Sequence, residues 1–440
     1  MVENLIIGSG FVSWALSRRL LALNRAFCVL DVSCLKDALE VSSSCEFFVD
    51  PVAVNKTARV GGGAKVWGGA FSWPDSGNWF ATEDRAWLSV QEGFGRPGTP
   101  SYQRLRSWGL RARTKQLAKS SKNPTLPFLN LEGHLVPRNW KWFSHRVHGS
   151  KTKILETATS LIEVKSRPEG GGVIEYLDKS VRKTINAERV YLASGPVINA
   201  VLAHLMSGQS KFPMGNHLSR VVGKLTIKSP RRLGPFARLK STGKFVTYSS
   251  PEASATSTGE SKGGLHHSLR LVPDETCGSL RELRISPSVS SITRFILLRL
   301  GMPQSLSVLQ MVDSGLVENA LLVESEKMEN GCLRVKIDFQ MSVSDECFRS
   351  ADRLVGEFVS NLKPWASFGP ILNPDLRDAA HYWGSLPMMK SAPGRKQSVV
   401  NEEFEICDLK GVFAPGASSF PLGSHGHPTF LAILTALQIR

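Results

Sequence analysis

The chain has 440 residues, of which 42% are hydrophobic and 21% are charged, a composition typical of a folded globular protein. This composition excludes a disordered chain and a fibrous repeat, and the length suggests two intimately joined domains. No apolar run reaches the roughly 20 residues of a membrane-spanning helix. The N-terminus also lacks the basic start and cleavage site of a secretory signal. We therefore expect a soluble, cytoplasmic protein without a transmembrane segment.

Basic residues are in excess, and the formal net charge is +16. The excess is concentrated in residues 104–122 and 211–244. Such regions either form solvated faces or steer an anionic substrate, an acidic partner or a membrane surface. No recognition motif accompanies the charge, so we expect no nucleic-acid partner. The seven cysteines are scattered without metal-ligand spacing, which predicts reduced thiols and no metal site.

The first predicted elements are a strand, a tight turn and a helix. Residues 2–7 form an apolar run, the turn reads Gly8-Ser9-Gly10, and apolar residues recur at helical spacing over 12–23. Glycines in such a turn let the backbone approach a pyrophosphate, whose charge meets free N–H groups at the positive end of the helix dipole. The pattern predicts a dinucleotide site that includes Gly8 and Gly10.

A second predicted strand over residues 26–30 ends in Asp31 and completes a β-α-β unit. Asp31 can accept hydrogen bonds from the hydroxyls of a ribose. Ser13 occupies the third position of the glycine fingerprint and is small enough for close packing of the helix on the strand. We expect Ser13 and Asp31 to belong to the dinucleotide site.

A glycine-rich loop follows over residues 59–69. Glycines at this density destabilise regular structure unless the backbone must come very near another group. Apolar residues stand among these glycines, which argues against a floppy surface loop. We expect cofactor contacts from six residues of the loop, namely Gly61, Gly62, Gly63, Val66, Trp67 and Gly68.

The middle of the chain predicts a return to the same domain. Residues 76–150 show no clean periodicity, whereas short β-like stretches follow around 158–164, with Leu161 as a predicted cofactor contact. Residues 170–172 predict a hairpin turn. A buried strand then runs into Ala193 and Gly195, both expected to contact the cofactor, and a helix follows.

Short alternating strands dominate residues 221–340, including 224–228, 244–248 and 333–339. They predict a mainly antiparallel sheet with one covered face. The stretch 249–264, rich in serine and glycine, predicts a loop or lid. The fold class is therefore predicted as α/β, with a Rossmann-like domain and a second, mainly antiparallel domain.

The order of the motifs resembles the glucose-methanol-choline (GMC) oxidoreductase family of flavoenzymes. The resemblance runs discontinuously from residue 4 to residue 440. Besides the motifs above, it rests on Gly215-Asn216-His217-Leu218, on His381-Tyr382-Trp383-Gly384-Ser385, and on a C-terminal pair of motifs, Gly416-Ala417-Ser418-Ser419-Phe420-Pro421 and His427-Pro428-Thr429.

The resemblance implies that FAD lies over the first turn and that the 60–69 loop skirts its isoalloxazine ring. It also implies contacts from Gly416, Ala417, Pro428 and Thr429. Some members of the family attach FAD through a histidine of the glycine-rich loop. Because Val66 occupies the best-aligned position here, we expect dissociable FAD.

The resemblance also implies a domain organisation. Residues 1–75, 151–220 and 376–440 would form the FAD-binding domain, and the last of these segments would complete the active site. Residues 76–150 would form an irregular or lid segment, and residues 221–375 would form the substrate domain.

Oxidation of an alcohol requires a base for the hydroxyl proton while hydride passes to flavin N5, and imidazole suits the first task. By motif position we expect His381 as the base and His427 as the group that hydrogen-bonds the substrate oxygen, although the two roles can be exchanged. His425 is the alternative partner. The aromatic residues Tyr382 and Trp383 are expected to narrow the pocket or to stack on a ring-shaped substrate.

The leading hypothesis is an FAD-dependent oxidoreductase acting on a CH–OH group of a small sugar, polyol or other alcohol. Alternatives are a non-redox lyase of the same fold and a flavin-binding protein without catalysis. An NAD-dependent dehydrogenase would share the first motif but would not explain the 61–69 loop. No motif indicates the electron acceptor.

Overall fold

The structure is a computed structural model of the chain. It describes residues 1–44, 70–71, 110–112, 130–131, 133–137, 153–227, 246–248, 268–273, 304–315, 319–362, 366–379, 381–388, 399–420 and 428–440.

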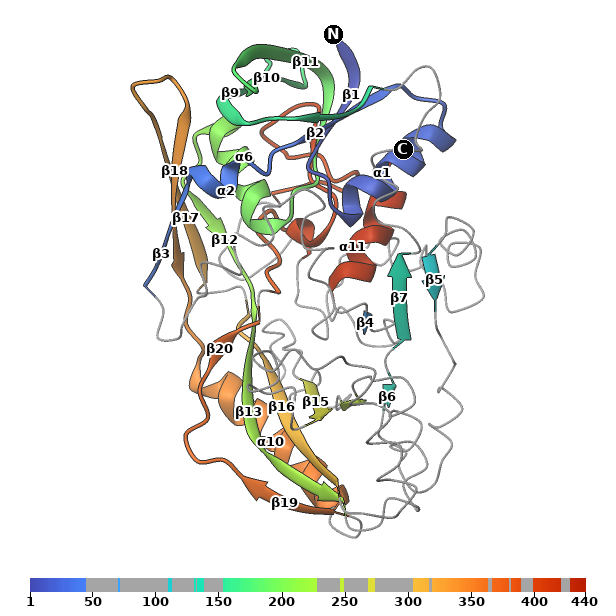
Figure 1. The fold of residues 1–440 in the computed structure, drawn as a ribbon, viewed down its shortest axis with the longest axis vertical. Coiled ribbons are helices and arrows are strands. Elements are labelled where there is room, and N and C mark those ends of the chain that lie inside the picture. The colour runs from blue at the N-terminus through green and yellow to red at the C-terminus, as the bar shows by residue number, and fades with distance from the viewer. Residues whose placement is uncertain are drawn as a thin grey trace.

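A parallel sheet occupies the upper part of the molecule, beside both chain termini (Figure 1). Its strands run in the spatial order β8 (Lys153–Thr157), β2 (Phe27–Asp31), β1 (Val2–Ile7), β11 (Val181–Leu192) and β21 (Val412–Phe413). All five residues of β2 are buried, as expected for a parallel strand covered on both faces. The predicted β-α-β unit is thus present.

Strand β11 has both parallel and antiparallel partners in this sheet. Its second half pairs with β1 in parallel, and its first half pairs antiparallel with β10 (Gly172–Asp178). Strand β10 pairs in turn with β9 (Ser160–Ser166), so the hairpin turn predicted at 170–172 is confirmed. The return of the chain to the first sheet therefore occurs where the sequence indicated.

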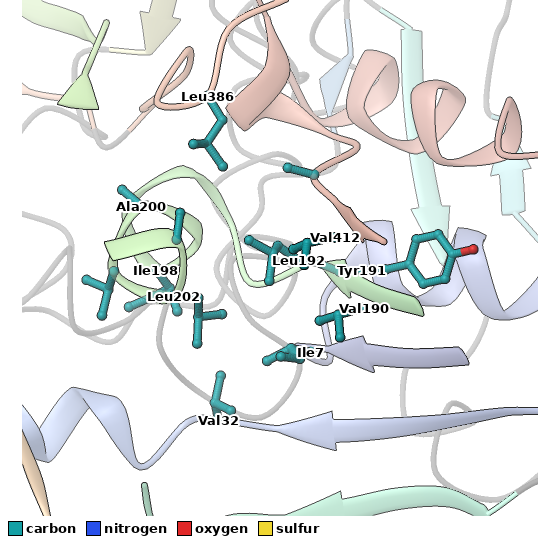
Figure 2. Packing of buried hydrophobic residues seen from close by; sticks show 14 of the residues in the cluster. Ile7, Val32, Val190, Tyr191, Leu192, Ile198, Ala200, Leu202, Leu386 and Val412 are labelled. Carbon is teal, nitrogen blue, oxygen red and sulfur yellow. The ribbon is translucent and has the colours of Figure 1, made fainter. Parts of the chain in front are cut away.

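Helices cover this sheet. Helix α1 (Phe11–Ala22) packs against the C-terminal helix α11 (Pro428–Leu437), and α6 (Pro196–Ser207) follows β11. A single turn of helix, α2 (Leu35–Ala38), follows β2. Figure 2 shows apolar side chains of α6 beside those of the sheet, with Ile198 and Leu202 near the strand residues Ile7 and Leu192. Burial of this apolar surface is the main contribution to the stability of the domain.

A second sheet lies along one side of the molecule (Figure 1). It contains β12 (Lys211–Pro213), β17 (Ala320–Lys327), β18 (Leu333–Gln340) and β3 (Leu39–Ser43). The strand predicted at 333–339 therefore exists, but it pairs with β17 and in parallel with β3. It does not join the antiparallel sheet that holds the strands of 221–312.

The lower part of the molecule is that antiparallel sheet. Its order is β19 (Ala366–Pro370), β13 (His217–Ile227), β16 (Gln304–Asp313), β15 (Ser268–Pro273), β14 (Val246–Tyr248) and β6 (Asn130–Leu131). Strand β20 (Arg377–Asp378) also pairs with β13. Helix α10 (Asp345–Leu362) packs against β16 and covers one face, as predicted.

Three short strands and one helical turn complete the described elements. They are β4 (Ala70–Phe71), β5 (Leu110–Ala112), β7 (Gly133–Pro137) and the 3₁₀ turn η7 (Ala417–Ser419). In the described part of the chain, no helix has the length and apolar character needed to cross a membrane. The mixed α/β architecture agrees with the predicted fold class, and the exact domain boundaries stay a prediction.

Candidate active site and cofactor cradle

The turn between β1 and α1 is held tightly against the turn that follows β11. Gly8 has a φ of +116°, and its N–H donates to the carbonyl of Leu30 over 2.8 Å. A Cβ added to Gly8 would lie 2.6 Å from the carbonyl oxygen of Ala193. Only glycine satisfies both the backbone conformation and the available space at this position.

The N-terminus of α1 is open to an anion. Gly10 is its N-cap residue, no side chain caps the helix, and the first turn contains no acidic residue. The hydroxyl of Ser13 is buried and has no hydrogen-bond partner among the residues that the structure describes. Uncapped N–H groups at the positive end of a helix dipole suit a pyrophosphate. The residues at this turn therefore fit the phosphates of a dinucleotide.

Asp31 stands at the end of β2 and is only 2% exposed. Its carboxylate accepts hydrogen bonds from the hydroxyl of Ser9 and, over 3.0 Å, from the N–H of Ser33. Each carboxylate oxygen keeps a further lone pair, so Asp31 can still accept from a ribose. Burial, followed by the negative charge of Asp31, raises the pKa of the nearby Cys34 thiol to about 12, which keeps this thiol protonated at neutral pH.

The side chain of Asn199 joins three segments beneath the cradle. Its Oδ1 accepts from the N–H of Ser194 over 2.9 Å, and its Nδ2 donates to the carbonyl of Leu192 and to Oγ of Ser418, each over 3.0 Å. The end of β11, the start of α6 and the turn η7 are therefore fixed to one another. Gly195, at the N-terminus of α6, has a φ of +90°.

Gly416 brings the C-terminal segment close to the first helix. Its φ is +110°, and an added Cβ would lie 3.0 Å from Cγ2 of Val12 on α1. The next residue, Ala417, accepts a hydrogen bond from the N–H of Gly384 over 2.9 Å. The segment that contains His381 is thus tied to the turn that packs on α1.

The His381 segment is also paired with the start of β13. Gly215 and Trp383 form an antiparallel bridge, with hydrogen bonds of 2.9 Å in both directions. The N–H of His381 donates to Oδ1 of Asn216 over 3.2 Å. The imidazole rings of His381 and His217 meet edge to face, with centroids 6.0 Å apart and an interplanar angle of 74°. His217, to which the sequence analysis gave no role, therefore lies beside the predicted base His381.

Asp378 also makes hydrogen bonds that hold the His381 segment in place. Its carboxylate accepts from Nδ2 of Asn216 over 2.7 Å and from the hydroxyl of Tyr382. The ring of Tyr382 stacks on Phe339, with centroids 5.2 Å apart. The ring of Trp383 covers Gly215, where an added Cβ would lie 2.3 Å from it.

These contacts correct one expectation. Tyr382 and Trp383 are 5% and 1% exposed, so their rings pack inside the protein. Little of either ring is exposed for stacking on a substrate. The ring of Tyr382 packs on Phe339, and the ring of Trp383 packs on Gly215.

The structure brings several predicted residues together. The turns at Gly8, Ala193 and Gly416 converge on α1, and hydrogen bonds connect them to the chain that bears His381. Leu161 lies on β9 with its side chain in the core, and its contact with a cofactor stays a prediction. Pro428 and Thr429 begin α11. Other predicted residues lie outside the described residues: Gly61, Gly62, Gly63, Val66, Trp67, Gly68, His425 and His427.

Three polar residues of the site received no role from the sequence. His217 and Asn216 stood in a motif of the resemblance, and no other signal in the sequence gave them a role. Asp378 stands in no motif. Each is identified by its contacts with the His381 segment, which lies more than 150 residues away from His217 and Asn216 in the sequence.

A β-α-β unit together with an antiparallel sheet defines a protein of the mixed α/β class. Residues 349–436 match the family described as GMC oxidoreductase. The resemblance predicted from the motifs is thereby confirmed, and it supports an oxidoreductase.

Among solved structures, the chain is similar to pyridoxine 4-oxidase from Mesorbium loti. The identity is 12%, the TM-score is 0.57, and the match covers 99% of this chain and 98% of that one. At this identity the likeness shows the fold, and it does so over the whole length. The comparison with curated proteins gave no match.

Proposed function

We propose that the protein is an FAD-dependent oxidoreductase that oxidises a CH–OH group of a small alcohol, sugar or polyol. One observation carries the proposal. The segment with His381 is hydrogen-bonded to the Ala417 turn, and the adjacent Gly416 packs on the first helix of the dinucleotide unit. These contacts support a proton acceptor held close to a dinucleotide cradle.

Different residues of this chain would bind different parts of FAD. Gly8, Gly10 and Ser13 would face the pyrophosphate, and Asp31 would accept hydrogen bonds from the ribose. Bound FAD would supply the group that accepts the hydride. Residues 59–69 and the start of α11 would complete the cradle, as the resemblance implies.

His381 would accept the proton of the substrate hydroxyl. Its backbone is fixed by Asn216 and by the Gly215–Trp383 bridge, so the chain that carries the ring is in position before substrate binds. Positioned proton transfer of this kind contributes about 10²–10⁴-fold to the rate. His427, or alternatively His425, would hydrogen-bond the substrate oxygen.

The name of pyridoxine 4-oxidase favours a ring-bearing alcohol as one substrate to test. The net charge of +16 favours anionic alcohols such as phosphorylated sugars as another class.

The proposal is tested by anaerobic reduction of the flavin. The purified protein should show the absorbance of oxidised flavin, and this absorbance should be lost when a substrate alcohol is added. Denaturation should release FAD from the protein, since no covalent attachment is expected. The panel should contain neutral sugars, phosphorylated sugars, pyridoxine and simple alcohols. If the protein binds no flavin even after incubation with FAD, the proposal is contradicted. A flavin that stays oxidised while the alcohol is consumed would favour the lyase alternative.

A pair of variants tests the role of His381. His381→Gln should retain FAD but lower the rate of flavin reduction by at least about 100-fold. The matched control is His204→Gln, because His204 lies on α6 and bonds Gln209 and Ser325 instead. Equal rates in both variants would exclude His381 as the base.

A further inference from the structure

A second histidine is buried beside the proposed base. His217 begins β13 and is 0% exposed, and its ring meets the ring of His381 edge to face. The carbonyl of His217 also accepts a hydrogen bond from the N–H of Ala379, over 3.1 Å. The two histidines are therefore held together by backbone pairing as well as by the contact of their rings.

A buried carboxylate lies opposite His217 on the neighbouring strand. In the register of β13 and β16, His217 is directly opposite Asp313, which is 1% exposed. Residues directly opposite in an antiparallel pair project to the same face, with Cβ atoms roughly 5 Å apart. Oδ1 of Asp313 accepts from the N–H of Gly315 over 3.0 Å. Because His217 shares this face of the sheet, a positive charge on its imidazole would offset the carboxylate through space.

The surroundings show what else acts on this pair. From the 378–382 segment, the charged or titratable groups are Asp378, His381 and Tyr382. From α10, Cys347 lies near Asp313: burial, and to a smaller extent the charge of Asp313, raise the pKa of its thiol. Asp378 is already bonded by Asn216 and Tyr382. His217 contacts His381 and also faces Asp313.

We propose that His217 is a positioning residue for His381: its imidazole holds the His381 ring and offsets the Asp313 carboxylate, so that His381 remains neutral and able to accept a proton. The inference rests on the proposed function for its use in catalysis. A neutral starting state is what a base needs, because an imidazole that already carries a proton cannot take one from the substrate. Without His217, the Asp313 carboxylate would favour the imidazolium form of His381.

The test follows the titration of His381 by NMR, in FAD-loaded protein that contains isotope-labelled histidine. Signals are assigned with the His381→Gln variant. In His217→Phe, which keeps a flat ring but removes both nitrogens, the midpoint of His381 should move to higher pH by about one unit. The double variant His217→Phe/Asp313→Asn should move it back, because the carboxylate is gone. His204→Phe is the matched control and should leave the midpoint unchanged.

Two further measurements keep the test decisive. If His217→Phe does not fold, His217→Gln replaces it, since Gln carries no charge and should shift the midpoint in the same direction. In the wild type, the signal of His217 should respond at the midpoint of His381. An unchanged midpoint in the His217 variant, an equal shift in the single and double variants, or a His217 signal that ignores His381 would each overturn the proposal.

The kinetics separate this proposal from the proposed function. If alcohols reduce the flavin, His217→Phe should lower the rate most at acidic pH, with FAD binding unchanged. If no alcohol reduces the flavin but the midpoint shifts as expected, the coupling of the two histidines stands and the proposed function fails. If alcohols reduce the flavin and the midpoint does not shift, only the role of His217 fails.

Discussion

Gly8 shows how strongly a single residue constrains the cradle. Its backbone is left-handed, and the space where a side chain would begin contains the carbonyl of Ala193. Another glycine has the left-handed backbone without the steric clash. Gly208, which ends α6, has a φ of +76° and has no atom within 4 Å of an added Cβ. The two glycines separate the effect of conformation from the effect of a clash.

We predict that Gly8→Ala lowers the free energy of unfolding by about 3 kcal/mol, since strain and a steric clash act together. Gly208→Ala should lower it by only about 1 kcal/mol, from strain alone. Urea unfolding of both variants provides the measurement. FAD affinity should fall in Gly8→Ala and not in Gly208→Ala. Equal losses of stability would mean that the first turn can move away from Ala193.

The sequence predicted the elements whose residue patterns lie within one short stretch of the chain. The apolar run of β1, the glycine turn and the helical spacing of α1 lie within one short stretch, and the structure has them as expected. The 170–172 turn and the strand into Ala193 are local in the same sense.

The elements that sequence reasoning missed depend on distant pairing. Strand β3 pairs with β18, and nothing within residues 39–43 identifies a partner almost 300 positions away. The contact of His217 with His381 has the same origin, because the bridge at Gly215 sets it. Burial of Tyr382 was equally hidden, since Phe339 and Asp378 come from different strands.

At the scale of elements, Asn199 forms a polar joint between β11, α6 and η7. Asn199 is 1% exposed and makes three hydrogen bonds, to Leu192 at the end of β11, to Ser194 two residues further on and to Ser418 of η7. We predict that Asn199→Ala lowers the free energy of unfolding by about 2–4 kcal/mol, because buried partners lose their hydrogen bonds. The matched control is Asn330→Ala. Its side chain accepts one bond, from the N–H of Cys332 over 3.0 Å, in an exposed turn.

The Asn330 variant should lose no more than about 1 kcal/mol. Chemical unfolding measures both variants, and hydrogen exchange at Ser194 reports the joint directly. A loss for Asn199→Ala no larger than that for Asn330→Ala would show that water replaces the missing side chain.

At the scale of the whole molecule, the two ends of the chain form one structure. Helix α11 packs on α1, and Nε of Arg19 donates to the carbonyl of Ile439 over 2.7 Å. Arg25 donates to the carbonyl of Arg440 over 2.8 Å. Figure 1 shows α11 and the C-terminus beside the first helix. The dinucleotide unit that the first residues begin is therefore incomplete until the last residues are present.

We predict that deletion of residues 428–440 removes FAD binding and lowers the free energy of unfolding by more than about 4 kcal/mol. Ile433 and Ala436 are 0% exposed, and burial of a large aliphatic side chain contributes about 1.5–3 kcal/mol. Removal of Arg440 alone is the control and should change stability by less than about 0.5 kcal/mol. Urea unfolding and hydrogen exchange in α1 measure the effect. A truncated chain that keeps FAD and its unfolding midpoint would show that the first sheet is complete without its C-terminal helix.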